Sequence, residues 1–151
     1  MEDVEKAYMA GVVDSDGSIW FGLKRHTYHY PNVTVSTQDE ILVNWIQERW
    51  RGVVEASSSA YRWKSLQGGD ALRTLIEDIL PYLITKRQQA LLVLESLDLG
   101  GGQGRPHVRE RRAELAAQCS ELNRELGRKY ALLGARLGGF AKSKKEIESH
   151  E

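Results

Sequence analysis

The stretch Met9–Gly17, with the sequence MAGVVDSDG, decides the fold because it joins an apolar helical segment to a polar turn. Apolar residues recur at helical spacing over residues 4–13, and the acidic start of this segment suits a helix N-terminus. Gly11 costs such a helix about 1 kcal/mol relative to alanine. Together with Ala7 and Ala10, it predicts a helix face that a second helix approaches closely.

Alternating apolar and polar residues after the motif predict two β-hairpins with a helix between them. This order predicts an α+β fold of αββαββα type, in which one face of an antiparallel sheet is covered by helices and the other is open. The expected strands are 18–25, 32–36, 53–58 and 60–66. The expected later helices are 39–50, 70–80, 85–97 and 105–126.

The length of 151 residues fits a single domain with a hydrophobic core of its own. We expect a core over residues 1–98, a glycine-rich linker over 99–104 and a C-terminal helical extension over 105–151. Within the extension, Leu132, Leu133 and Leu137 favour a separate helix, and the polar residues 141–151 are expected to fray.

Charge and cysteine content restrict the setting and the partners. The formal net charge is zero, yet residues 86–145 hold thirteen Lys and Arg against six Asp and Glu, so the chain is electrostatically polarised. The sequence has no apolar run near the ~18 residues of a membrane span and begins without a secretory signal. Cys119 is the only cysteine and is expected in the core. These features predict an intracellular protein of the cytoplasm, nucleoid or an organelle that is not secreted and contacts no membrane.

Residues 9–17 resemble the LAGLIDADG motif, since they keep its alanine, its first glycine, both aspartates and the final glycine. Two later segments resemble landmarks of the same family: the strand-to-helix passage over 35–52, and Leu80–Gln88 with its Pro-aromatic-Leu, Lys and Gln pattern. The chain is therefore similar to the LAGLIDADG homing endonucleases over roughly its first hundred residues. The resemblance implies an intron-encoded, Mg²⁺-dependent nuclease that cuts both strands of a long, near-palindromic DNA site.

The single motif copy implies a homodimer. In the family the motif helix packs against the same helix of a second copy, and here that copy must come from another subunit. The implied interface residues are Ala7, Ala10 and Gly11, and the two-fold axis would bring two Asp16 side chains together.

The end of the motif helix predicts a metal site, because free carbonyl groups and the helix dipole favour a cation there. The resemblance implies that Asp16 is the catalytic metal ligand, with the backbone carbonyl of Ser15 beside it, and that Asp14 belongs to the structural helix junction. Mg²⁺ is the expected ion. We expect Mn²⁺ to substitute for it and Ca²⁺ to bind without efficient cleavage.

Two further catalytic positions follow from the resemblance. Lys86 lies where the family keeps a basic residue near the scissile phosphate. A water-ordering polar residue falls among Thr37, Gln38 and Asp39, of which we choose Gln38. The family's additional basic residue just beyond this point has no counterpart, because Ile41 and its neighbours are apolar.

The face of the sheet opposite the apolar residues is expected to contact double-stranded DNA in the major groove. Lysines of the C-terminal tail are expected to contact the DNA backbone. The expected DNA-binding residues are Trp20, Lys24, Asn32, Thr34, Ser36, Arg62, Lys64, Lys142, Lys144 and Lys145.

Other functions remain compatible with the same scaffold. The chain could act as a maturase that binds intron RNA, or as a DNA-binding protein without cleavage activity, although the retained Asp16 and Lys86 disfavour a pure binding role. A structural dimerisation domain is the other alternative, against which the polar sheet face speaks. His26 and His29 are spaced like zinc ligands, but without further ligands a turn or a DNA-backbone contact is favoured.

Overall fold

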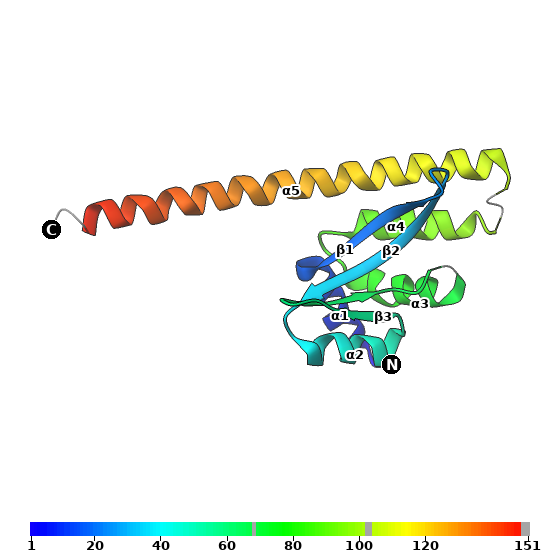
Figure 1. The fold of residues 1–151 in the computed structure, drawn as a ribbon, viewed down its shortest axis with the longest axis horizontal. Helices are drawn as coiled ribbons and strands as arrows, with labels where there is room; N and C mark the ends of the chain where they lie inside the picture. The colour runs from blue at the N-terminus through cyan, green and yellow to red at the C-terminus, as the bar shows by residue number, and fades with distance from the viewer. Residues whose placement is uncertain (68, 102–103, 149–151) are drawn as a thin grey trace. The chain divides into compact units, whose positions relative to one another are not determined.

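The computed structural model describes residues 1–67, 69–101 and 104–148, with side chains described up to residue 137 except at residue 69. The chain divides into two compact units, Met1–Ser120 and Glu121–Glu151. The expected linker over 99–104 falls partly outside the described residues, and the boundary between the units lies within the last helix. The first unit holds the sheet and the motif helix, so it carries the candidate site (Figure 1).

The motif helix α1 spans Asp3–Asp16 and begins with a capping box between Glu2 and Glu5. Its buried residues pack into the main core: Met9, Ala10, Val12 and Val13. Gly17 follows as the C-cap and is at once the first residue of strand β1. A Cβ atom at Gly17 would lie 2.6 Å from the Cα of Val13, so the chain turns against its own helix at a distance that only glycine allows.

Four antiparallel strands form one sheet in the order β1-β2-β4-β3 (Figure 1). The strands are β1 Gly17–Lys24, β2 Tyr28–Thr37, β3 Val53–Ala56 and β4 Tyr61–Lys64. Ile19, Val33, Val35 and Trp63 are fully buried on one face and share a hydrophobic cluster with the helices of the first unit. The α+β fold and its antiparallel sheet, predicted from the alternation of residues, are confirmed.

The first hairpin turn is shorter than predicted, because β2 begins at Tyr28 rather than at residue 32. The backbone N–H of Thr27 donates to the carbonyl of Lys24 at 3.0 Å, across Arg25 and His26, which both adopt positive φ angles. Pro31 fits inside β2 because β4 pairs only with residues 34–37, so its missing N–H faces no partner strand. A proline between aromatic residues is therefore what made this strand segment resemble a turn.

The remaining helices of the first unit follow the predicted order with shifted ends. They are α2 Glu40–Trp50, α3 Gly69–Ile79, the short 3-10 helix η1 Leu80–Tyr82, and α4 Arg87–Asp98. Asp39 caps α2 by accepting hydrogen bonds from the backbone N–H groups of Ile41 and Leu42. The stretch containing Pro81 separates α3 from α4, as predicted.

Helix α5 spans Pro106–Glu148 without interruption, so the expected break after residue 126 is wrong. Of the residues expected to fray, 141–148 are helical and 149–151 lie outside the described residues. Its first part belongs to the first unit, where Val108, Leu115 and Cys119 are buried. Burial raises the pKa of the Cys119 thiol to about 11, which confirms a core cysteine rather than a nucleophile. In the second unit, Leu132, Leu133 and Leu137 are exposed on the same continuous helix.

Replacing Gly17 by alanine is expected to lower the free energy of unfolding by about 2–3 kcal/mol, because the added methyl group meets backbone atoms of Val13 that cannot move away. Urea unfolding followed by circular dichroism measures the loss. Gly127→Ala is the matched control, since a Cβ there meets no atom within 4 Å and alanine favours a helix. Equal stability of the two variants would contradict the tight junction.

Candidate active site and nucleic-acid interface

Asp14 ties the end of α1 to the start of α4. Its carboxylate accepts hydrogen bonds from the backbone N–H groups of Ile84 (2.7 Å), Thr85 (3.2 Å) and Lys86 (3.1 Å), and from the Thr85 hydroxyl (3.0 Å). These N–H groups immediately precede α4, where no helix carbonyl is available to accept from them. The structural role expected for Asp14 is therefore confirmed.

Lys86 makes the reciprocal contact. Its Nζ donates to the carbonyl oxygens of Val13 (2.7 Å), Asp14 (2.8 Å) and Gly17 (2.8 Å), which uses all three ammonium hydrogens. The residue is only 7% exposed. Burial lowers the pKa of the Lys86 ammonium, and the negative charges of Asp14 and Asp16 oppose this shift. Lys86 thus lies beside the expected catalytic carboxylate, but its hydrogen bonds hold the backbone of the turn.

We call these reciprocal contacts of Asp14 and Lys86 the junction latch. Asp16 projects from the turn that the latch holds, and its side chain is exposed. Within the described part of the chain, no hydrogen bond or ion pair engages its carboxylate. The Ser15 hydroxyl turns back and donates to the carbonyl of Gly11 at 2.9 Å.

The three candidates for ordering water differ in whether their side chains already make hydrogen bonds within the fold. The Asp39 carboxylate caps α2, and the Thr37 hydroxyl accepts a hydrogen bond from the backbone N–H of Asp39 at 3.1 Å. Gln38 is exposed and its amide is free of hydrogen bonds to other described residues. Val35 on β2 pairs with Gly17, the residue that follows α1. Residues 36–39, which follow Val35 in the chain, therefore continue past the end of α1.

The strand register places the expected DNA-contacting side chains on one face. Thr34 pairs with Lys64 and Ser36 with Arg62, while Trp20 stands opposite Asn32. These positions alternate along the strands with the buried residues Ile19, Val33, Val35 and Trp63, so they share the opposite face, as predicted. Ser36 and Arg62 are exposed.

Asn32 and Thr34 are not open to solvent in the free protein, contrary to expectation. They are 0% and 6% exposed, respectively. The Nζ of Lys64, on β4, lies 5.8 Å from the ring centroid of Trp20, on β1. Because β2 runs between these two strands, the contact crosses the middle of β2 and covers it.

Sequence reasoning missed Tyr30. Its ring lies against Gly22, where an added Cβ would come within 2.4 Å of the ring, and the Nζ of Lys24 sits 4.7 Å from the ring centroid. Tyr30 shares the face of Asn32, two residues away. Tyr28, Tyr30 and Asn32 alternate along β2, which places them on one face of the sheet. The sequence indicates this alternation only if Pro31 is assigned to the strand and not to a turn.

The outward face of α1 differs from the expected interface. Ala10 is 0% exposed and packs inside its own core, so its assignment to a contact with a second copy is corrected. Ala7 is half-buried, whereas Gly11 is exposed, and a Cβ at Gly11 would meet nothing within 4 Å. Val4 and Tyr8 complete the outward stripe as exposed apolar residues.

The remaining expectations concern the lysines of the C-terminal tail, a metal site and membrane spans. The side chains of Lys142, Lys144 and Lys145 lie outside those that the structure describes. Among the described residues, no group of three or more His, Cys, Asp or Glu side chains could hold a metal ion. The same residues contain no helix that combines the length and the apolar character of a membrane span.

Comparison with solved structures finds this fold in homing endonucleases. I-CvuI in complex with its DNA target superposes with a TM-score of 0.72 and 27% sequence identity, over 80% of this chain and 82% of that chain. The archaeal intron-encoded homing endonuclease I-Vdi141I, complexed with DNA, gives a TM-score of 0.70 and 18% identity, over 81% and 86%. For the LAGLIDADG meganuclease I-AabMI the values are 0.65 and 17%, over 74% of this chain and 43% of that chain.

No model of a protein family matches the sequence, and neither does any curated protein. The fold nevertheless matches that of homing-endonuclease domains. With the nine-residue motif at its start, the chain is similar to the LAGLIDADG homing endonucleases in both sequence and fold.

Replacing Lys86 by methionine is expected to lower the free energy of unfolding by about 3 kcal/mol, because three carbonyl oxygens lose a charged donor. Chemical denaturation measures the change. Gln88→Met is the matched control, since Gln88 is exposed on the same helix and its replacement should cost within about 0.5 kcal/mol. If both variants are equally stable, the latch does not hold the junction.

Proposed function

We propose that the chain is a site-specific DNA endonuclease that cuts both strands of a long, near-palindromic site with the help of a divalent cation. The observation that carries this proposal is the exposed carboxylate of Asp16, which makes no hydrogen bond or ion pair with any other described residue, at the helix end fixed by the junction latch. A binding protein has no need for an unpaired carboxylate next to DNA phosphates, because the two charges repel.

The residues at this end of α1 fit a hard cation only in part. Asp16 and the Ser15 carbonyl offer oxygen ligands at a helix C-terminus, which suits Mg²⁺ and, as a substitute, Mn²⁺. Crystals of I-CvuI with DNA contained Ca in one case and Mg in another. When bound, such an ion would activate water and stabilise the leaving 3′-oxygen of a phosphodiester. One chain lacks the remaining ligands among its described residues, so phosphate oxygens and a second subunit must supply them.

The chain's own residues divide the work. Asp16 binds the cation, and Lys86 positions the turn that carries Asp16. The ammonium group of Lys86 has no free hydrogen to donate to a DNA phosphate, because it already donates to three carbonyl oxygens. We therefore assign Lys86 a positioning role instead of direct contact with the scissile phosphate. Gln38 is the water-ordering candidate, because the fold already engages the side chains of Thr37 and Asp39.

The open sheet face is the proposed DNA-binding surface. It carries Lys24, Arg62 and Lys64, which can contact phosphates or guanine edges, and Trp20 and Tyr30, whose rings cover the face in the free protein. Binding to DNA would exchange the contacts of these cations with rings for contacts with phosphates.

We further propose that two copies associate through the outward stripe of α1. Gly11 is open there although it weakens the helix, which is explained if a second helix packs on it. An apolar hollow of about 410 Å³ adjoins the stripe, lined by Val4, Glu5, Tyr8, Asp39, Ile41, Leu42 and Trp45. A two-fold axis through this stripe would bring two Asp16 carboxylates together and complete the ligand set that one chain lacks.

Replacing Asp16 by asparagine is expected to abolish cleavage while leaving DNA affinity within a few-fold, because only the charge at the ion is lost. The substrate is duplex DNA spanning the intron-free allele of the host gene, with Mg²⁺ or with EDTA. Asp3→Asn, at the exposed opposite end of α1, should cleave normally. Metal-independent binding without scission by the wild type would leave only a maturase or a DNA-binding role.

Replacing Gly11 by leucine is expected to weaken dimerisation at least about tenfold, because the side chain would separate the two motif helices. The isolated fold should tolerate the change, since the space around Gly11 is open. Sedimentation equilibrium measures the association. Gly134→Leu, at another open helical glycine, serves as the control. A wild-type monomer at micromolar concentration would overturn the dimer.

A further inference from the structure

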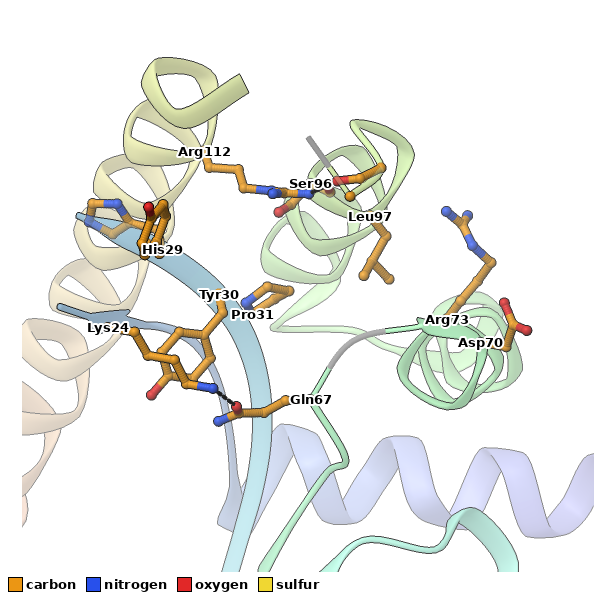
Figure 2. A pocket seen from close by; sticks show the side chains of 13 residues that line it. Lys24, His29, Tyr30, Pro31, Gln67, Asp70, Arg73, Ser96, Leu97 and Arg112 are labelled. Atoms are coloured by element: carbon orange, nitrogen blue, oxygen red, sulfur yellow. Dashed lines mark hydrogen bonds between the residues drawn. The ribbon is translucent and has the colours of Figure 1, made fainter. Parts of the chain in front are cut away.

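A cavity of about 770 Å³ lies in the first unit, away from the end of α1 that carries Asp16. It is bordered by the distal part of the first hairpin, the start of α3, the end of α4 and the start of α5 (Figure 2). We call it the Arg112 cavity. Its labelled lining residues are Lys24, His29, Tyr30, Pro31, Gln67, Asp70, Arg73, Ser96, Leu97 and Arg112.

Polar atoms without partners gather in this cavity. Among the described side chains, four buried polar atoms lack a hydrogen-bond partner, and three of them belong to lining residues: His29 Nδ1, Ser96 Oγ and Arg112 Nη1. The fourth is Oδ1 of Asn32. A buried polar atom without a partner is costly, so three around one hollow indicate a missing partner there.

Among these groups, the guanidinium of Arg112 is the best suited to bind an anion. It is 9% exposed, and its Nη2 donates to the carbonyl oxygen of Ser96 at 3.2 Å and to that of Gly100. No carboxylate pairs with it among the described residues, and burial alone lowers its pKa. A guanidinium is an excellent ligand for phosphate, and this one keeps Nη1 unused.

Ser96 and the remaining charges agree with an anion. Ser96 is 1% exposed, and its hydroxyl makes no bond to the preceding helical turn, which is the usual solution for a helical serine. Lys24 and Arg73 add positive charge at the border, although Arg73 also pairs with Asp98 at 2.7 Å. Asp70 is the one opposing carboxylate in the lining.

We propose that the Arg112 cavity binds a phosphate oxyanion, whose oxygens accept hydrogen bonds from Arg112 Nη1 and Ser96 Oγ (Figure 2). Arg112 already neutralises the carbonyl end of α4, so that helix end does not repel the anion. The phosphate can come from the DNA backbone, since Lys24 belongs to both the cavity and the DNA-facing side of β1, or from a small phosphorylated molecule.

Titration calorimetry of the full chain with inorganic phosphate, at constant ionic strength and without DNA, tests the site. We expect saturable binding that Ser96→Ala weakens about tenfold, because one donor to a charged ligand is lost. Ser96→Ala should also unfold at the same or a higher urea concentration than the wild type, since the hydroxyl has no partner to lose. Ser120→Ala, an exposed serine on α5, is the matched control and should bind like the wild type.

Absence of saturable binding, or equal affinity of the Ser96→Ala and Ser120→Ala proteins, would overturn the proposal. So would a loss of stability in Ser96→Ala without a change in phosphate affinity, because ordered water alone would then satisfy the hydroxyl. A second series with duplex DNA in Ca²⁺ distinguishes the two sources. If the DNA backbone occupies the cavity, DNA displaces phosphate, and Ser96→Ala weakens DNA binding relative to Ser120→Ala. If a small molecule occupies it, DNA and phosphate bind together.

Discussion

The junction latch is the interaction on which the rest of the active end depends. Asp14 satisfies the backbone N–H groups before α4, and Lys86 satisfies the carbonyl groups around the end of α1. Each charge thus neutralises a helix end that would otherwise be left unpaired. Because Gly17 lets β1 leave directly against α1, the latch leaves Asp16 as the side chain that points outward. A motif of nine residues therefore fixes a fold junction and exposes the carboxylate of Asp16 beside it.

The same geometry links catalysis to assembly. The described part of one chain offers a single carboxylate and carbonyl groups at this helix end, which is fewer ligands than a divalent cation needs. The motif helix also exposes a glycine and neighbouring apolar residues that its own core leaves uncovered. In the dimer that we propose, the packing of a second copy on α1 would remove both deficits. On the sheet, the contact of Trp20 with Lys64 crosses β2 where Asn32 and Thr34 are buried.

The sequence allowed much of the fold to be predicted, because strand alternation and helical spacing are local signals. It failed at Pro31, which is tolerated because β4 pairs only with residues 34–37 of β2, and at α5, whose glycines do not interrupt the helix. The role of Asp14 was predictable from the motif. The hydrogen bonds of Lys86, the burial of Ala10 and the covering of Asn32 were not, because each depends on contacts between segments far apart in sequence. The cluster of unpaired atoms around Arg112 likewise joins the first hairpin to α4 and α5.

The most direct test of the central claim is the location of bound metal in a crystal of the protein with uncleaved target DNA, measured by the anomalous scattering of Mn²⁺ or Ca²⁺. We predict metal at the ends of two α1 helices related by a two-fold axis, in contact with Asp16 of both subunits and with DNA phosphates. Metal bound elsewhere, or Asp16 turned away from the DNA in a single bound subunit, would contradict the account.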